Sequence, residues 1–388
     1  MLPSFMYVSA NGSSLVIGLI MSLSLIWITT MDYNLWVTNS KLSVLFIIFF
    51  LIHCYVTMIF GPYIVTQKHI LSLLLLFFIL ISALLLSTEL EKIPNEKFII
   101  ILKVISSLML LLGLLSLTIN IDFLNYSNYA KSIFPFAEPS HYVLAMSGVL
   151  VATGFYISNL LRIFFLGLII IFILFYQSVL MLALLVLMIF SYYTVSFTKS
   201  IMTLLILSLL ILLFFHYSEN AHYYLDRLNF SDENKNLTTL VYLQGWSDAY
   251  YSFIETNGIG LGFQNMGKLE PHEISELIYT LAGEYKNRSD GGFLVAKIIG
   301  EFGFLGILLV ITYIVQFFKS VHYLRKFLKY KVFYNSNNTY FPTRLVFAHS
   351  IIVSFFIEMF TRGYGYFSPG VFLFFVAIFL ISFDRTLK

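Results

Sequence analysis

The stretch HILSLLLLFFILISALLLST (69–88) contains no Asp, Glu, Lys or Arg and decides the class of this protein. A helix of about 20 apolar residues crosses the hydrocarbon core of a bilayer while satisfying its own backbone hydrogen bonds. The 388-residue chain as a whole is 59% hydrophobic and 11% charged. That charged fraction is about half of what a soluble domain carries. We therefore predict an all-α, polytopic integral membrane protein.

Ten further runs have a similar composition, so the sequence predicts about eleven transmembrane helices, with a range of 10–12. Short connections near Asn159 and Gln177 set that range. The chain divides into 1–216 with eight spans, a loop at 217–291 that contains short helices, and 292–388 with three spans. The expected spans are 14–30, 42–60, 69–88, 98–120, 141–159, 161–176, 178–196, 200–216, 292–318, 345–361 and 368–384.

Lys and Arg in the short loops fall mostly on one side of this topology, and the cytoplasmic side is the one that collects them. The basic stretch KSVHYLRKFLKYK (319–331) lies on that side. The segments 121–140, 217–291 and 361–370 share the opposite side. We therefore expect the chemistry of the protein on its non-cytoplasmic face.

Composition and motifs exclude several functions. A net charge of +3 argues against a general nucleic-acid binder. The single cysteine, Cys54, rules out an intrachain disulfide and a cysteine-based zinc site. HExxH, GxSxG and DxD motifs are absent from the sequence. The glycine-rich stretch at 257–267 lacks the Gly-Lys-Ser/Thr ending of a phosphate-binding P-loop. We expect no metal and no cofactor.

Three outer residues are candidate proton acceptors. Glu138 and His141 lie at the outer end of the expected span 141–159, and Asp290 directly precedes two glycines. A carboxylate or an imidazole at such a position can act as a general base. Both carboxylates have a structural alternative as helix caps. The sequence leaves the choice of base open.

Three outer arginines, Arg227, Arg288 and Arg362, lie near span ends. Arginine binds phosphate oxygens through permanently charged, bidentate contacts, although one near a span end can also be an interface anchor. Between two helical segments lies NGIGLGFQNMG (257–267). Its alternating glycines allow close backbone approach to a ligand, or they form turns.

The sequence EPSHY (138–142) resembles the EPSH(F/Y) signature of Wzy-type O-antigen polymerases. Further similar features are the glycine stretch 257–267, the segment RSDGGFLVAKIIGEFGFLG (288–306) and the turn RGY (362–364). The resemblance covers most of residues 134–370. The glycine stretch and the Glu-x-Gly element are shared with O-antigen ligases, which usually carry a His where this chain has Arg288-Ser289-Asp290.

The resemblance implies a GT-C-like glycosyltransferase in the bacterial inner membrane, with its active site facing the periplasm. Such enzymes transfer a growing glycan from undecaprenyl pyrophosphate to a sugar hydroxyl of a new lipid-linked repeat unit, without metal. The implied partners are undecaprenyl-pyrophosphate-linked oligosaccharides, membrane lipids and a chain-length regulator. The expected catalytic residues are Glu138, His141, Arg288 and Asp290, and the expected substrate contacts are Arg227, Arg362, Gly258, Gly260 and Tyr364.

Three other functions compete with this hypothesis. An O-antigen ligase uses the same donor, with lipid A–core as the acceptor. A flippase for lipid-linked oligosaccharides carries charged residues deep within its spans. Here Lys297, Glu301 and Glu358 fall toward span ends on a simple register count, and most polar residues lie outside. A structural membrane protein is the remaining alternative.

Overall fold

A computed structural model of the chain describes residues 1–9, 15–30, 41–60, 67–119, 126, 131–193, 202, 205, 221–230, 235–334 and 342–383. Every regular element in these ranges is helical. The elements are α1 (Leu2–Ser9), α2 (Leu15–Thr29), α3 (Lys41–Phe60), α4 (Gln67–Lys92), α5 (Asn95–Thr118), α6 (Pro139–Gly154), α7 (Asn159–Tyr176), α8 (Val179–Tyr193), α10 (Ala221–Leu228), α11 (Leu237–Glu255), α12 (Glu273–Ala282), η3 (Arg288–Asp290), α13 (Leu294–Tyr334), α14 (Thr343–Ser354), α15 (Phe356–Phe360) and α16 (Pro369–Phe383).

Within the described residues, five helical stretches are long and apolar enough to cross a membrane. The chain is therefore a helical membrane protein. Four shorter apolar helices accompany the long ones, while the expected span 200–216 lies outside the described residues except for 202 and 205. The five stretches are His69–Lys92, Asn95–Thr118, Asn159–Tyr176, Leu294–Tyr330 and Thr343–Phe360.

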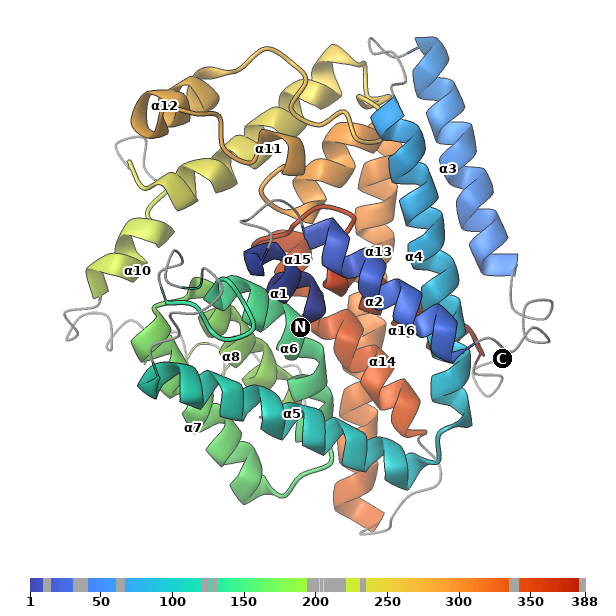
Figure 1. The fold of residues 1–388 in the computed structure, drawn as a ribbon, viewed down its shortest axis with the longest axis vertical. Coiled ribbons are helices and arrows are strands. Elements are labelled where there is room, and N and C mark those ends of the chain that lie inside the picture. The colour runs from blue at the N-terminus through green and yellow to red at the C-terminus, as the bar shows by residue number, and fades with distance from the viewer. Residues whose placement is uncertain are drawn as a thin grey trace.

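The core of the bundle is built around α14, in which every residue except Arg344 is buried. It packs against α6, α13 and α16, and α4 packs in turn against α16. Figure 1 shows α14 and α6 in the middle of the molecule, α3 at its right edge, α11 and α12 at the top, and α10 at the left side below them. The interior helices carry small and hydroxylated residues, which allow close helix contact and hydrogen bonding between helices.

The long helix α13 is kinked at Gly303, whose φ of 56° and ψ of −128° are not helical. At the kink the carbonyl groups of Gly300 and Glu301 accept hydrogen bonds from the backbone amides of Leu261 and Gly262, at 3.0 and 2.9 Å. The amide of Phe304 donates to the carbonyl of Gly258 at 2.8 Å. The glycine-rich segment therefore satisfies the backbone groups that the kink leaves without helical partners.

Close approach explains why glycines occupy this segment. A Cβ atom on Gly260 would lie 2.5 Å from the carbonyl oxygen of Glu301, and one on Gly303 would lie 1.9 Å from that of Gly258. Gly258 and Gly260 also have φ values of 79° and 89°, which favour glycine. The structure thus places the two predicted glycine contacts in a packing interface between the loop and α13.

Candidate active site

Glu138 occupies the N-cap position of α6, in extended conformation, and Pro139 follows at the first helical position. Proline fits there because it has no amide hydrogen to leave unpaired. The Glu138 side chain makes no capping hydrogen bond. The structural alternative of a side-chain cap therefore does not hold for Glu138, and its carboxylate is available to a partner elsewhere in the fold.

That partner is Arg362, in the turn before α16. One guanidinium nitrogen of Arg362 lies 3.0 Å from Oε2 of Glu138, and the side chains are 35% and 38% exposed. Ser140 donates to the same carboxylate oxygen at 2.8 Å and is itself 2.8 Å from the Tyr364 hydroxyl. Since the single hydroxyl hydrogen of Ser140 goes to the carboxylate, Tyr364 is the donor in the second bond. The structure thus joins Glu138, Arg362 and Tyr364 in one network.

His141 lies next to this network. Its ring is 4.5 Å from the Tyr364 ring, centroid to centroid, in an edge-on arrangement. Its Nδ1 shares a 3.0 Å hydrogen bond with the hydroxyl of Ser4, which also accepts from the amide of Ala137 at 3.1 Å. The N-terminal helix α1 therefore positions the imidazole, a contact that no motif in the sequence indicates.

Burial and neighbouring charges set the protonation states of Glu138 and Tyr364. Burial alone would raise the pKa of Glu138, but Arg362, His141 and the Ser140 hydrogen bond outweigh it and lower the pKa below its ordinary value. Burial raises the pKa of Tyr364 to about 12 despite the neighbouring Arg362. At neutral pH Glu138 is an ionised acceptor and Tyr364 a protonated donor, as the hydrogen bonds require.

The pair of Glu138 and Arg362 opens onto a cavity of about 690 Å³ between α6, α8, α10, α11 and α15. Its other charged lining residues are Arg227 and Lys131, and Tyr176, Tyr223 and Tyr242 supply aromatic walls. Cations suit phosphate oxygens, and aromatic faces suit apolar sugar surfaces. This cavity has the size and lining of a site for a large, polar, anionic ligand.

Arg227 and Lys131 both lie over the ring of Tyr223, at 4.0 and 5.7 Å from its centroid. Burial and the charge of Arg227 both lower the pKa of Lys131. Lys131 donates a hydrogen bond to the neutral side chain of Gln177. No carboxylate within the described residues forms an ion pair with either cation. Two neighbouring cations that pair with no carboxylate of the described part of the chain favour an anionic ligand.

The predicted residues Arg288 and Asp290 do not line this cavity. Arg288 lies 3.7 Å from Asp248 of α11 and donates to the carbonyl of Leu269 at 2.8 Å. Asp290 is 4.0 Å from the ammonium group of Lys297. Arg288 therefore ties α11 to the loop before α12, and Asp290 faces the start of α13. Asp290 ends the short helix η3 and is not the N-cap of α13.

Lys297 and Glu301 form an ion pair of 3.5 Å inside α13, with side chains only 2% and 0% exposed. Lys297 also donates to the carbonyl of Ser289, and the amide of Met266 donates to Glu301 at 3.2 Å. A register count of the sequence placed both residues near a span end and did not reveal their burial. Ionisable residues within an apolar run, four positions apart, are the available signal for such a pair.

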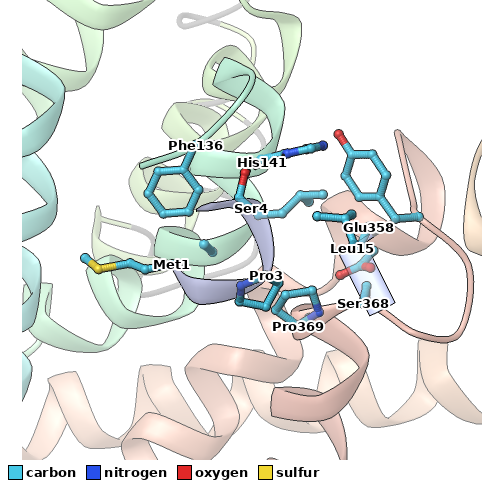
Figure 2. Close-up of a pocket in the computed structure, with 13 residues that line it drawn as sticks. Met1, Pro3, Ser4, Leu15, Phe136, His141, Glu358, Ser368 and Pro369 are labelled. Carbon is cyan, nitrogen blue, oxygen red and sulfur yellow. Dashed lines mark hydrogen bonds between the residues drawn. The ribbon is translucent and has the colours of Figure 1, made fainter. Parts of the chain in front are cut away.

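A second, small cavity of about 30 Å³ lies behind His141. Figure 2 shows Ser4 and His141 on one side of it and Glu358 and Ser368 on the other. Glu358 is 2% exposed, and a Cβ on Gly370 would lie 1.7 Å from its Oε2. The glycine at the start of α16 therefore leaves room for this carboxyl group, whose burial the register count of the sequence did not reveal.

No family model, curated protein or solved structure matches the chain. Among the described residues, no group of three or more His, Cys, Asp or Glu side chains is arranged to hold a metal ion. Fold and site together define a class: a helical membrane protein with an ion-paired carboxylate beside a cationic, aromatic cavity.

Proposed function

We propose that this protein is a membrane-embedded glycosyltransferase that polymerises a lipid-linked glycan repeat unit without a metal. The observation that carries the proposal is the contact of Glu138 with Arg362 on the wall of a cavity that also holds Arg227 and Lys131. One carboxylate and three cations suit transfer from a sugar pyrophosphate, which needs an acceptor for one proton and positive charge to stabilise the multiply charged pyrophosphate that leaves.

In the proposed reaction, a hydroxyl oxygen of the incoming repeat unit attacks the anomeric carbon of the donor glycan. The bond from that carbon to the pyrophosphate oxygen breaks, and the pyrophosphate leaves with the electron pair. Arg227, Lys131 and Arg362 stabilise its charge, and Glu138 takes the hydroxyl proton. Only one nitrogen of Arg362 contacts Glu138, which leaves other guanidinium donors for a phosphate oxygen.

His141 has a supporting role in this proposal. Its ring packs edge-on against Tyr364, and Ser4 fixes its orientation. It therefore keeps Tyr364 in place to donate to Ser140. Tyr364 belongs to the same network and does not contact the pyrophosphate in this scheme. Arg288 and Asp290 remain sequence-based predictions, because their contacts are with protein groups.

The finer assignment rests on the similarity of EPSHY (138–142) to the polymerase signature. It comprises a GT-C-like fold with about eleven spans, a location in the bacterial inner membrane and a site facing the periplasm. The donor is then an undecaprenyl-pyrophosphate-linked oligosaccharide, with a chain-length regulator as a further partner. The distribution of Lys and Arg supports the orientation.

Reconstitution tests the proposal directly. The purified protein in liposomes is supplied with a synthetic lipid-linked repeat unit, and the products are separated by size. A ladder of multiples supports a polymerase. Transfer only to added lipid A–core identifies a ligase, and movement across the bilayer without new bonds identifies a flippase; either result rejects the proposal. Arg362→Gln should slow formation of the ladder by about 10²–10³-fold, whereas the matched control Lys286→Gln, at an exposed position, should form it at the wild-type rate.

A further inference from the structure

Helix α11 exposes an apolar stripe. Trp246, Tyr250 and Ile254 are 39%, 61% and 51% exposed. They are spaced four residues apart, so they share one face of the helix. An exposed stripe of large apolar residues on a surface helix marks a surface that meets something other than water.

The opposite face of α11 is polar and buried. Gln244, Asp248 and Ser252 are 1%, 3% and 1% exposed, again at a spacing of four. Gln244 donates to the carbonyl of Lys286 at 2.8 Å, and Asp248 pairs with Arg288 at 3.7 Å. The helix is thus polar toward the protein and apolar outward, which is the reverse of a helix on a water-soluble domain.

A second exposed stripe runs along α13. Its residues recur at a spacing of three and four, so they form one continuous face. They are Phe304, Leu308, Ile311, Val315 and Phe318, at 64%, 58%, 51%, 48% and 59% exposure. Since this part of α13 is long and apolar enough to cross a membrane, its exposed face is the one that meets lipid chains.

The two stripes meet at the kink of α13. Phe253, on the last turn of α11, packs edge-on against Phe304 with ring centroids 4.8 Å apart. The amide of Phe304 donates to the carbonyl of Gly258, just beyond the end of α11. The exposed face of α11 is therefore continuous with the lipid-facing stripe of α13.

We propose that α11 is an interfacial helix whose face of Trp246, Tyr250 and Ile254 docks onto the bilayer, at the boundary between headgroups and acyl chains. Tryptophan and tyrosine suit that boundary because each has an apolar ring and a polar group. Because this face is continuous with the lipid-facing stripe on α13, its partner is lipid. The proposal does not depend on the reaction that the protein catalyses.

The docking has a structural consequence for the cavity. Thr238, Thr239 and Tyr242, near the start of α11, line the cavity that contains Arg362. Because Trp246, Tyr250 and Ile254 of the same helix contact the bilayer surface, the cavity lies at the level of the headgroups. A ligand whose charged group is attached to a lipid reaches it without leaving the membrane.

Tryptophan fluorescence provides the test, because the chain has only three tryptophans and Trp27→Phe/Trp36→Phe leaves Trp246 alone. The variant is placed in liposomes of phosphatidylcholine with some phosphatidylglycerol, and the phosphatidylcholine is brominated on its acyl chains. We expect bromine to quench Trp246 several-fold more than a Glu284→Trp reporter in a tryptophan-free chain. Glu284 is 69% exposed and serves as the aqueous control. A Leu308→Trp reporter is the membrane control.

Cysteine labelling provides an independent measurement if the fluorescence variants do not fold. In a Cys54→Ala background, Tyr250→Cys should be protected in liposomes from a charged, membrane-impermeant maleimide, whereas Glu284→Cys should react. Quenching of Trp246 by aqueous iodide to the level of the Glu284→Trp reporter, or free labelling of Tyr250→Cys, overturns the proposal. Protection without quenching by brominated lipid also overturns it, because a protein then covers the face.

Discussion

Two ion pairs near the turn between α15 and α16 differ in their surroundings. Arg362 and Glu138 lie on a cavity wall with about a third of each side chain exposed, at 3.0 Å. Lys297 and Glu301 are 3.5 Å apart and almost completely buried within α13. A pair that reaches solvent can exchange its partner for a ligand, whereas a buried pair cannot separate without leaving an uncompensated charge. In the proposed function, the first pair takes part in the reaction, whereas the second pair stabilises the fold.

The largest expected effect on stability comes from breaking the buried pair. Lys297→Met leaves the carboxylate of Glu301 buried without a cation, and such losses cost about 3–5 kcal/mol. The thermal unfolding of the purified protein in detergent measures this effect. Lys329→Met, at an exposed position near the end of the same helix, is the control and should unfold as the wild type does. Equal stability of the two variants would contradict an architectural role for Lys297.

Breaking the half-exposed pair should affect activity far more than stability. In the proposed reaction, Arg362→Gln removes a fixed cation beside the leaving group, and losses of this kind reduce kcat by about 10²–10³-fold. Its effect on unfolding should stay within about 1 kcal/mol, because exposed ion pairs contribute little. Turnover of a lipid-linked repeat unit and thermal unfolding are measured on the same preparation. A variant that retains full turnover removes Arg362 from the mechanism.

Gly260→Ala tests whether the glycine stretch packs or binds ligand. Its Cβ would lie 2.5 Å from the carbonyl oxygen of Glu301, so we expect a loss of about 1–3 kcal/mol from overpacking. Gly283→Ala is the matched control, because its φ of 75° is similar but nothing lies within 4 Å of the added Cβ. Equal destabilisation of the two variants would point to backbone strain alone.

Removing the Ser140 hydroxyl from the network should have a smaller effect. Ser140→Ala deletes the contacts to Glu138 and Tyr364, and a single hydrogen bond contributes about 0.5–1.5 kcal/mol. We expect a drop of about tenfold in kcat/KM, since 1.4 kcal/mol corresponds to that factor. Ser147→Ala, on the same helix, is the control. An unchanged kcat/KM in Ser140→Ala would show that the hydrogen bonds of Ser140 to Glu138 and Tyr364 are not needed for the reaction.

The smallest expected effect concerns pH. Because Arg362 and the other partners of Glu138 hold its pKa below the ordinary value of 4.5, the pair stabilises the fold above pH 4.5. That stabilisation is lost as pH falls through the pKa of the folded state. The wild type should be more stable than Glu138→Gln by less than about 1 kcal/mol above pH 4.5. This difference should become smaller as the pH falls below 4.5. A difference that grows on acidification would show instead that folding raises the pKa of Glu138.

Much of the helical layout could be predicted from the sequence. The stretch 69–88 lies within α4 (Gln67–Lys92), and the expected spans 98–120 and 368–384 match α5 and α16 within three residues. Insertion of a helix into lipid depends on the apolar content of one local segment, so it can be predicted from the sequence. The full span count, the membrane side and the reaction stay predictions.

Only the tertiary structure decided which polar residues meet. Glu138 and Arg362 are 224 positions apart, and His141 finds Ser4 across 137 positions. The same packing directs Arg288 to Asp248 and buries the pair of Lys297 and Glu301, neither of which we predicted from the sequence. Hydropathy fixes where a helix crosses the bilayer, but the rotation of each helix and its neighbours follow from packing alone.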